Sequence, residues 1–383
     1  MNAMSRPSIL SAATTRFGRL EGRSATDLMA QAANAALADA GVPRAQVDGL
    51  LCGYATTYPH LMLATLMAEK LGMQPAYAHG IQMGGATGAA MLMLAGDLVR
   101  SGRCRHVLVV AGENRLTGQA VDTSIQTLAQ VGDPVTEVPN GASVPAYYAL
   151  LASEYMHRTG LTEADLGSFA VLMRSHAGAH PDAHLREPIT LQQVLASKPI
   201  ASPLRLLQCC PISDGAAAFV VSAAPGPVVL AGAGQAHRHQ HLSGLQDVMR
   251  SGAADAFERM LRDAGARRGE VDYLAIYDSF TITLVMLLEE LGFAERGQAA
   301  ARLRAGDYAS GGPLPLNTHG GLLSFGHSGV AGGMAHAVEA WRQLAGRAEA
   351  RQIPDRRCAV VHADGGVLSA HVSLLLRRAQ SGA

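Results

Sequence analysis

The sequence predicts an α/β protein built from two similar halves, each containing βαβ-type units. Three observations support this fold class. The chain of 383 residues is 48% hydrophobic and 16% charged with 42 glycines, which is typical of α/β enzymes whose strands and helices pack closely. Short continuous apolar runs, such as HVLVVAG and CAVVHA, predict parallel strands that are covered on both faces. A repeat within the chain relates one half to the other.

The repeat has an offset of 224 positions: ALADAGVPRAQVDGLLCGY, from Ala36, matches MLRDAGARRGEVDYLAIYD, from Met260. Both copies predict a helix that ends at a glycine, a polar loop and a short buried strand. Each half then continues with a glycine-rich turn, a helix, a basic loop and a strand ending in glycine. We therefore predict two domains, 1–225 and 226–383, with a loop insertion at about 115–205 in the first.

The composition excludes several classes of protein. Lys plus Arg and Asp plus Glu balance at 31 each, so no net field favours nucleic acid or an anionic membrane. Five scattered cysteines argue against a disulfide framework and for a reducing compartment. The N-terminal MNAMSRPSIL lacks the pattern of a signal peptide, and two prolines divide the apolar segment Gly215–Gly234 into two predicted strands. We expect a soluble, cytoplasmic protein.

Five loops follow predicted strands or open predicted helices: MGGATG, YDSFT, NTHGG, GHSGVAGG and HADGG. In stacked α/β halves, such loops converge at the seam between the halves. Helix N-termini and exposed glycine amides at this seam can donate hydrogen bonds to a developing oxyanion. The sequence therefore predicts an active site at the seam.

Four stretches resemble, in the expected order, signatures of the thiolase superfamily: RSHAGAHPDAHLREPIT, LLQCCPISDGAAAFVV, YDSFTITLVMLLEELGF and GGPLPLNTHGGLLSFGHSGVAGG. The resemblance covers almost the whole chain and is nearest to the sterol-carrier-protein-x and lipid-transfer-type thiolases. It implies a duplicated thiolase fold with five layers, α-β-α-β-α. It also implies a homodimer that acts on a coenzyme A thioester, with no covalently bound cofactor and no metal.

The chain departs from this family at both catalytic cysteines. The nucleophile of thiolases lies in a Gly-Cys-Ala-Ser/Thr-Gly turn, and here the corresponding position is Gly85. The stretches VHADGG and YDSF also lack the second cysteine. His327 is retained, although Ser328 replaces the usual proline. A classical thiolase is not expected, because its acyl group is held by a thiolate and Gly85 has no side chain.

The remaining groups predict different chemistry. By resemblance, His327 stabilises the enolate of a thioester, and Tyr277 replaces an Asn or His of the family motif. The backbone N–H of Gly85 can serve as an oxyanion donor. We therefore predict retro-aldol cleavage of a β-hydroxyacyl-CoA, as in a branch of lipid-transfer-type aldolases that lacks both cysteines. Those enzymes work with an OB-fold partner, so a heterotetramer with such a partner is also expected.

Further residues of these loops complete the predicted site. His362, at the end of a buried strand, is a candidate catalytic group, although a core position would explain it too. Asp278 could instead cap or orient its neighbours, and His319 could be a loop-tip residue. Thr87 is the hydroxyl nearest to Gly85, but no base stands beside it in the sequence. The predicted substrate-binding residues are Asp278, Ser279, His319, Gly366 and Thr87.

Two other functions remain open. The chain could be an acetyl-CoA acetyltransferase or related acyltransferase with an unorthodox nucleophile, or a non-catalytic protein that binds acyl-CoA or lipid.

Three alternating histidines in HRHQH could ligate zinc, but a solvated loop explains them better. The segment VVLAGAGQAH lacks the third glycine of a dinucleotide-binding turn. The Met- and Leu-rich segment from Tyr54 to Met73 predicts a helix at a core, pocket or dimer position.

Overall fold

The structure is a computed structural model, and it describes residues 6–141 and 143–380. Residues 1–5, which begin the first predicted domain and include half of the MNAMSRPSIL segment, lie outside this range. Residues 381–383, at the end of the second predicted domain, lie outside it too. The strands are β1 (Ser8–Thr14), β2 (Gly49–Gly53), β3 (Tyr77–Ile81), β4 (His106–Asn114), β5 (Pro199–Ala201), β6 (Leu204–Arg205), β7 (Asp214–Ser222), β8 (Val228–His237), β9 (Tyr273–Ile276), β10 (Cys358–Gly365) and β11 (Ala370–Arg378).

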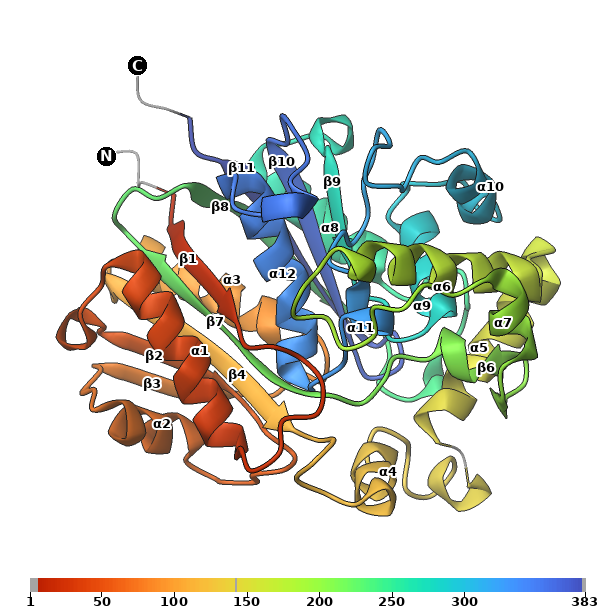
Figure 1. The fold of residues 1–383 in the computed structure, drawn as a ribbon, viewed down its shortest axis with the longest axis horizontal. Helices are drawn as coiled ribbons and strands as arrows, with labels where there is room; N and C mark the ends of the chain where they lie inside the picture. The colour runs from red at the N-terminus through yellow and green to blue at the C-terminus, as the bar shows by residue number, and fades with distance from the viewer. Residues whose placement is uncertain (1–5, 142, 381–383) are drawn as a thin grey trace.

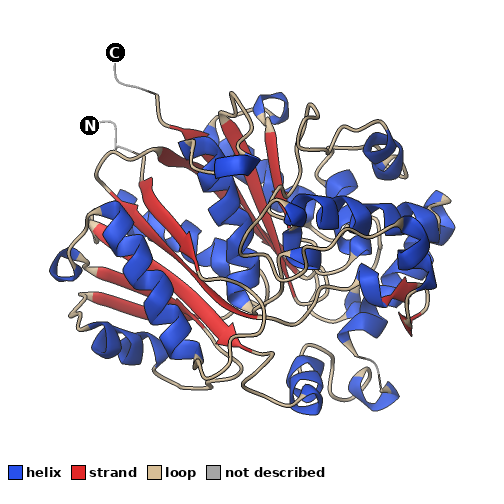
Figure 2. Cartoon of the chain, viewed as in Figure 1, coloured by secondary structure: helices blue, strands red, loops and turns tan. Residues whose placement is uncertain are grey.

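Helices and strands alternate in the first part of the chain, whereas later parts contain runs of consecutive helices, and in Figure 2 the helices pack around the strands. The helices are α1 (Ala25–Ala40), α2 (Leu63–Leu71), α3 (Thr87–Arg100), α4 (Val121–Ala129), α5 (Val144–Thr159), α6 (Glu163–Gly178), α7 (Leu191–Ala196), α8 (Ala253–Ala264), α9 (Thr281–Glu290), α10 (Ala299–Arg304), α11 (Gly321–Ser324) and α12 (Val330–Ala345).

The main strands follow the order β3-β2-β4-β7-β1-β8-β11-β10-β9. Within each half the outer strands pair in parallel, β2 with β3 and β4 and β9 with β10, whereas the inner strands pair antiparallel. A short antiparallel contact between β1 and β8 joins the halves. The order β2-β4-β7-β1 of the first half therefore recurs as β9-β10-β11-β8 in the second.

Helices form three layers around these strands. The central helices α3 and α12 touch each other and contact strands of both halves (Figure 1). Helices α1 and α2 cover the outer face of the first half, while α8 and α9 cover that of the second. Buried apolar side chains fill the space between the layers in three clusters. The predicted duplicated fold with five layers is confirmed.

The sequence repeat is visible in equivalent hydrogen bonds. Gly41 ends α1 with φ 64° and Gly265 ends α8 with φ 61°, so each glycine occupies the left-handed conformation that favours this residue. Asp48 accepts two backbone N–H groups at the start of β4, at 2.7 and 2.8 Å. Asp272, 224 positions later, accepts two at the start of β10, at 2.8 and 3.0 Å. Each aspartate fixes where its neighbouring strand begins.

The segment between β4 and β7 has no counterpart in the second half, where four residues join β10 to β11. It contains α4 to α7 and forms the lobe opposite β1–β3 in Figure 1. The predicted division of the chain into domains stays a prediction. The helix predicted from Tyr54 to Met73 is shorter than expected, because residues 54–62 form a loop and only Leu63–Leu71 are helical.

All five cysteines, each within the described ranges, are free thiols. None of the helices that the structure describes between residues 6 and 380 has the length and hydrophobicity needed to cross a bilayer.

Candidate active site

The turn that carries Gly85 lies between β3 and α3. Thr87 closes this turn: its hydroxyl accepts the N–H of Met83 at 2.8 Å and donates to the carbonyl of Gly84 at 2.6 Å. Backbone bonds from the N–H groups of Ala86 and Thr87 complete the turn and do not use the N–H of Gly85. Thr87 is fully buried. Its hydroxyl has a structural role, so the geometry does not favour the predicted substrate contact.

The residue at position 85 has to be glycine for a steric reason. A Cβ atom at this position would overlap the hydroxyl of Tyr277 and the carbonyl oxygen of Asp364. The Tyr277 hydroxyl thus occupies space that the side chain of a nucleophile at position 85 would need. Gly333 of α12 leaves room for the turn itself, since its own Cβ would lie only 2.8 Å from the carbonyl oxygen of Gly85.

Tyr277 and His327 come from different loops and meet at this point. Tyr277 follows β9 directly, and its N–H donates to the carbonyl of His362 in β10 at 3.0 Å. His327 lies two residues before the N-cap of α12 and is held by backbone bonds to Pro211 and Ser213, each 3.0 Å. The Tyr277 hydroxyl lies 3.1 Å from Nε2 of His327, with the rings at 87°. The two principal predicted side chains therefore converge beside Gly85.

Ser328, which stands in place of the family's proline, anchors the loop that carries His327. Its hydroxyl donates to the carbonyl oxygens of Gly215 at 2.6 Å and Glu113 at 3.1 Å. Both acceptors lie at the ends of first-half strands, β7 and β4. A serine therefore replaces the conformational restriction of proline with hydrogen bonds across the seam.

The protein environment favours the neutral form of both side chains. Burial raises the pKa of Tyr277 well above its ordinary value. Burial and the positive charge of Arg115 lower the pKa of His327 to about 3. At neutral pH the pair holds a phenol and a neutral imidazole. One proton can be exchanged between them because they share a hydrogen bond.

Buried histidines predict a specific dependence of stability on pH. Burial lowers the pKa of His327 and His180 to about 3, and that of His371 to about 4, from 6.5. Between these values the unfolded chain binds more protons than the folded chain, so stability falls as the pH is lowered through this window. We expect the melting temperature, measured by circular dichroism, to decrease between about pH 6.5 and about pH 4.

The matched variant for this prediction is His327→Gln, which removes one of the three imidazoles and keeps the other two. Its melting temperature should change less with pH than that of the wild type. Parallel curves for the two proteins would contradict the role assigned to His327 in the pH dependence of stability.

Asp278 and His319 lie behind Tyr277. Asp278 accepts the N–H of Leu322 at 2.7 Å, at the start of α11, and lies 3.2 Å from Nε2 of His336. His319 packs edge-on against His336, with ring centroids 4.8 Å apart, and is only 2% exposed. Capping explains Asp278, as the sequence allowed. His319 is a core residue rather than a loop tip, because the rings of His336 and Phe325 enclose it.

Ser279 and Gly366 border the site. Ser279 is 6% exposed, and its carbonyl accepts the N–H of Cys210 at 3.0 Å. Gly366 has φ 71°, and its carbonyl accepts the Tyr148 hydroxyl at 3.2 Å. The predicted substrate contacts of Ser279, Gly366, Asp278 and His319 stay predictions, and the last two side chains are fully enclosed by other residues.

The imidazole of His362 is directed toward β11 rather than toward Tyr277. Its Nδ1 lies 2.7 Å from the Ser373 hydroxyl, and its Nε2 lies 3.2 Å from Nδ1 of His371. Nε2 of His371 lies 3.0 Å from the carbonyl of Leu368, which can only accept. The hydrogen bonds of His362 are therefore all used inside the core. His362 contributes to the site through its backbone carbonyl, which accepts the N–H of Tyr277. Its side chain was predicted to be catalytic, but it is directed away from Tyr277.

Asp364 and Tyr148 were not predicted from the sequence. The Tyr148 hydroxyl donates to Oδ2 of Asp364 at 2.8 Å, and both side chains are almost fully buried. Asp364 belongs to the HADGG loop that was singled out, so an acidic residue there was a usable signal. Tyr148 lies in α5 of the insertion, 216 positions away, and only the fold brings it close.

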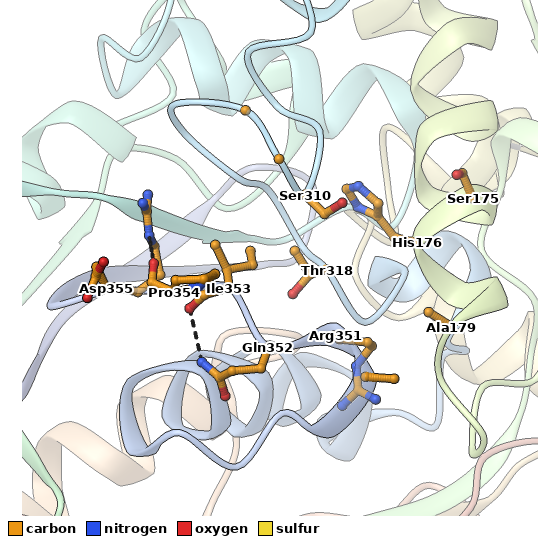
Figure 3. Close-up of a pocket in the computed structure, with 14 residues that line it drawn as sticks. Ser175, His176, Ala179, Ser310, Thr318, Arg351, Gln352, Ile353, Pro354 and Asp355 are labelled. Atoms are coloured by element: carbon orange, nitrogen blue, oxygen red, sulfur yellow. Dashed lines mark hydrogen bonds between the residues drawn. The ribbon is translucent and has the colours of Figure 1, made fainter.

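A separate cavity of about 520 Å³ lies between the C-terminal part of α6, the loop at Ser310 and residues 350–356 (Figure 3). Its polar lining includes His176 and Arg351. None of the predicted site residues lines this cavity, so it is distinct from the seam. Within the described ranges no group of three His, Cys, Asp or Glu side chains is placed to hold a metal ion.

The fold and the site together define the class of protein. Residues 8–224 match the family described as "Thiolase, N-terminal domain", and residues 234–378 match "Thiolase C-terminal domain-like". The chain belongs to the thiolase family, and it is an enzyme of this superfamily.

Relatives with different named activities match most of the chain. An "Acetyl-CoA acetyltransferase" of Methanothermobacter thermautotrophicus is 30% identical over 94% of this chain and 96% of its own length. A "Steroid side-chain-cleaving aldolase" of Thermomonospora curvata is 33% identical over 85% of this chain and 87% of its own. The solved structure described as "Ltp2-ChsH2(DUF35) aldolase" is 29% identical with a TM-score of 0.82, covering 97% of this chain and 98% of that one.

Proposed function

We propose that this enzyme cleaves the Cα–Cβ bond of a β-hydroxyacyl-CoA by a retro-aldol reaction, without forming an acyl-enzyme. The observation that carries this proposal is the Tyr277 hydroxyl, which fills the space beside Gly85 and lies 3.1 Å from Nε2 of His327. A paired phenol and imidazole can move a proton in and out of a substrate. Their convergence beside Gly85 supports a catalytic site over a non-catalytic binding protein.

In the proposed reaction, the one proton that leaves the β-hydroxyl group is returned to Cα, so no proton is gained or lost. Tyr277 takes the proton of the β-hydroxyl group while its own proton passes to Nε2 of His327. The electron pair of the Cα–Cβ bond moves into the thioester, giving a carbonyl product and an enolate. The imidazolium of His327 stabilises the enolate until the proton returns through Tyr277 to Cα. The N–H of Gly85, which the turn does not use, donates to the enolate oxygen.

Acyl transfer is the second candidate, because a relative of 30% identity is named an acetyltransferase. It requires a nucleophile, and the nearby hydroxyls and thiols are poorly suited to that role. The hydroxyl of Thr87 is bonded within its turn. Burial raises the pKa of Cys209 to about 12, and that of Cys210 still further, so neither forms a thiolate readily. These observations favour cleavage over transfer.

Two assemblies are part of the proposal. The aldolase of the solved structure is named together with ChsH2(DUF35), and this chain covers nearly all of the matched subunit. We propose an OB-fold partner of that type, bound to a homodimer of this chain as a heterotetramer. We also propose that the enzyme is cytoplasmic and that it acts on a coenzyme A thioester as its substrate, with no covalently bound cofactor.

The decisive experiment supplies short and steroid-like β-hydroxyacyl-CoAs to the enzyme, alone and with an OB-fold partner of the DUF35 type. We expect a carbonyl product and a shortened acyl-CoA in equal amounts, detected by mass spectrometry. Intact-protein mass spectrometry during turnover should show the unmodified chain. An acyl adduct on the protein would support acyl transfer, and the absence of cleavage in every combination would contradict the proposed function.

A further inference from the structure

Asp364 is a buried acid at the seam that the proposed reaction does not yet use. It lies one residue before the end of β10 and is 1% exposed. Its carbonyl oxygen lies where a side chain at Gly85 would be. Its Oδ2 accepts the Tyr148 hydroxyl, while Oδ1 is buried and has no hydrogen-bond partner in the described structure. A buried oxygen without a partner is rare and needs an explanation.

No cation compensates this carboxyl. Other buried acids are compensated: Glu339 lies 3.0 Å from Arg351, and Asp214 and Glu289 each accept at least two backbone N–H groups. Among the ion pairs of residues 6–141 and 143–380, none includes Asp364. A buried carboxylate that lacks such partners is strongly disfavoured, and it takes up a proton instead.

The neighbouring elements offer no hidden cation either. His371 lies opposite Asp364 on β11, but its two ring nitrogens face His362 and the carbonyl of Leu368. Burial lowers the pKa of His371 to about 4, so this ring is neutral. Tyr148 of α5 and Tyr277 after β9 present phenols, which carry no charge. Burial correspondingly raises the pKa of Asp364 well above its ordinary value.

We propose that Asp364 is a catalytic residue of the same site: a neutral carboxylic acid that donates its Oδ1–H to the enolate oxygen, together with the N–H of Gly85. This inference rests on the proposed retro-aldol function. Oδ2 already shares a hydrogen bond with the Tyr148 hydroxyl, which also reaches the carbonyl of Gly366, so we place the proton of the acid on Oδ1, the oxygen without a partner. The proton stays on Asp364 throughout, so the balance of the reaction is unchanged.

The neutral form matters for catalysis. An ionised carboxylate near a forming enolate would repel it in a site of low dielectric, whereas a neutral acid stabilises the new charge by hydrogen bonding. Tyr148 positions the acid by fixing Oδ2. Tyrosine and a protonated aspartate can act together as an oxyanion site, as they do in an unrelated isomerase.

Two substitutions separate a donor from a base. Asp364→Asn keeps a donor and an acceptor of similar shape, so cleavage should stay within about tenfold of wild type, whereas Asp364→Ala should lose about a hundredfold or more in kcat. If Asp364 were an ionised base, both variants would be equally inactive, which would overturn the proposal. Wild-type rates in both variants would overturn it too. Asp355→Asn, at an exposed position, is the control and should leave activity unchanged.

A second measurement needs no substrate. The infrared difference spectrum of wild type minus Asp364→Asn at neutral pH should contain the C=O stretch of a protonated carboxylic acid, and the Asp355→Asn difference should not. A carboxylate signal in its place would overturn the inference even if Asp364→Ala failed to fold. If the wild type cleaves no β-hydroxyacyl-CoA while the band is present, the proposed function fails and the protonation state of Asp364 still stands.

Discussion

Tyr277→Phe will lose about a hundredfold to ten-thousandfold of the rate of carbon–carbon cleavage, the range typical of removing a general acid–base group. The phenyl ring fills nearly the same volume, so the packing of the side chain against Gly85 and Gly333 is kept. What disappears is the hydroxyl through which the proton passes to His327. Steady-state kinetics on a cleavable β-hydroxyacyl-CoA measures the effect, which should fall on kcat rather than on KM.

Tyr273→Phe, at the start of the strand that Tyr277 follows, is a matched control. The Tyr273 hydroxyl is also fully buried, but it lies 2.9 Å from the hydroxyl of Thr318, away from His327. Its removal should lower the free energy of unfolding by about 1 kcal/mol and leave cleavage unchanged. If Tyr277→Phe retained full activity, or if both variants lost activity equally, the Tyr277–His327 pair would not be the proton-transfer group.

Most of the fold was predictable because the chain contains its own internal comparison. The match between Ala36 and Met260 predicted equivalent helices, loops and strands, and the equivalent hydrogen bonds of Asp48 and Asp272 follow the same offset. A repeat identifies pairs of equivalent positions at which side chains of the same kind hold equivalent backbone N–H groups. The insertion between β4 and β7 has no second copy, so its helices could not be placed in this way.

The candidate site was only partly predictable, because a side chain's position along a strand does not give its direction. His362 lies within β10, and Tyr277 directly follows β9, the parallel neighbour of β10. The imidazole of His362 is bonded to Ser373, whereas the phenol of Tyr277 reaches the seam. That difference depends on the pairing of β10 with β11, which brings Ser373 opposite His362. No local pattern in the HADGG loop predicts the pairing of β10 with β11.

A cysteine side chain at position 85 and the hydroxyl of Tyr277 exclude each other. The Tyr277 hydroxyl and a side chain at position 85 would overlap, so the chain can hold only one of them in this arrangement. A thiolase presents a nucleophile at the apex of the turn, whereas this enzyme presents a phenol from the opposite half of the fold. Glycine at position 85 is therefore a steric requirement of Tyr277 in this arrangement.

Gly85→Cys, which restores the family's sulfur, is consequently expected to abolish cleavage without creating a thiolase. The new Cβ would displace the Tyr277 hydroxyl and press on the carbonyl of Asp364, whose strand β10 is paired on both sides and cannot easily move. Overpacking of this kind lowers the free energy of unfolding by about 1–3 kcal/mol. Denaturant unfolding measures that loss, and intact-protein mass spectrometry with an acyl-CoA should detect no acyl-enzyme.

Gly80→Ala gives the matched control, because a Cβ at this exposed position of β3 meets no atom within 4 Å. It should leave both cleavage and stability unchanged. Gly85→Ala separates the steric effect from the sulfur: we expect it to be as inactive and as destabilised as Gly85→Cys, since the overlap begins at Cβ. Full cleavage activity in Gly85→Ala would mean that the seam has room for a side chain. The Tyr277 hydroxyl would then not define the reaction.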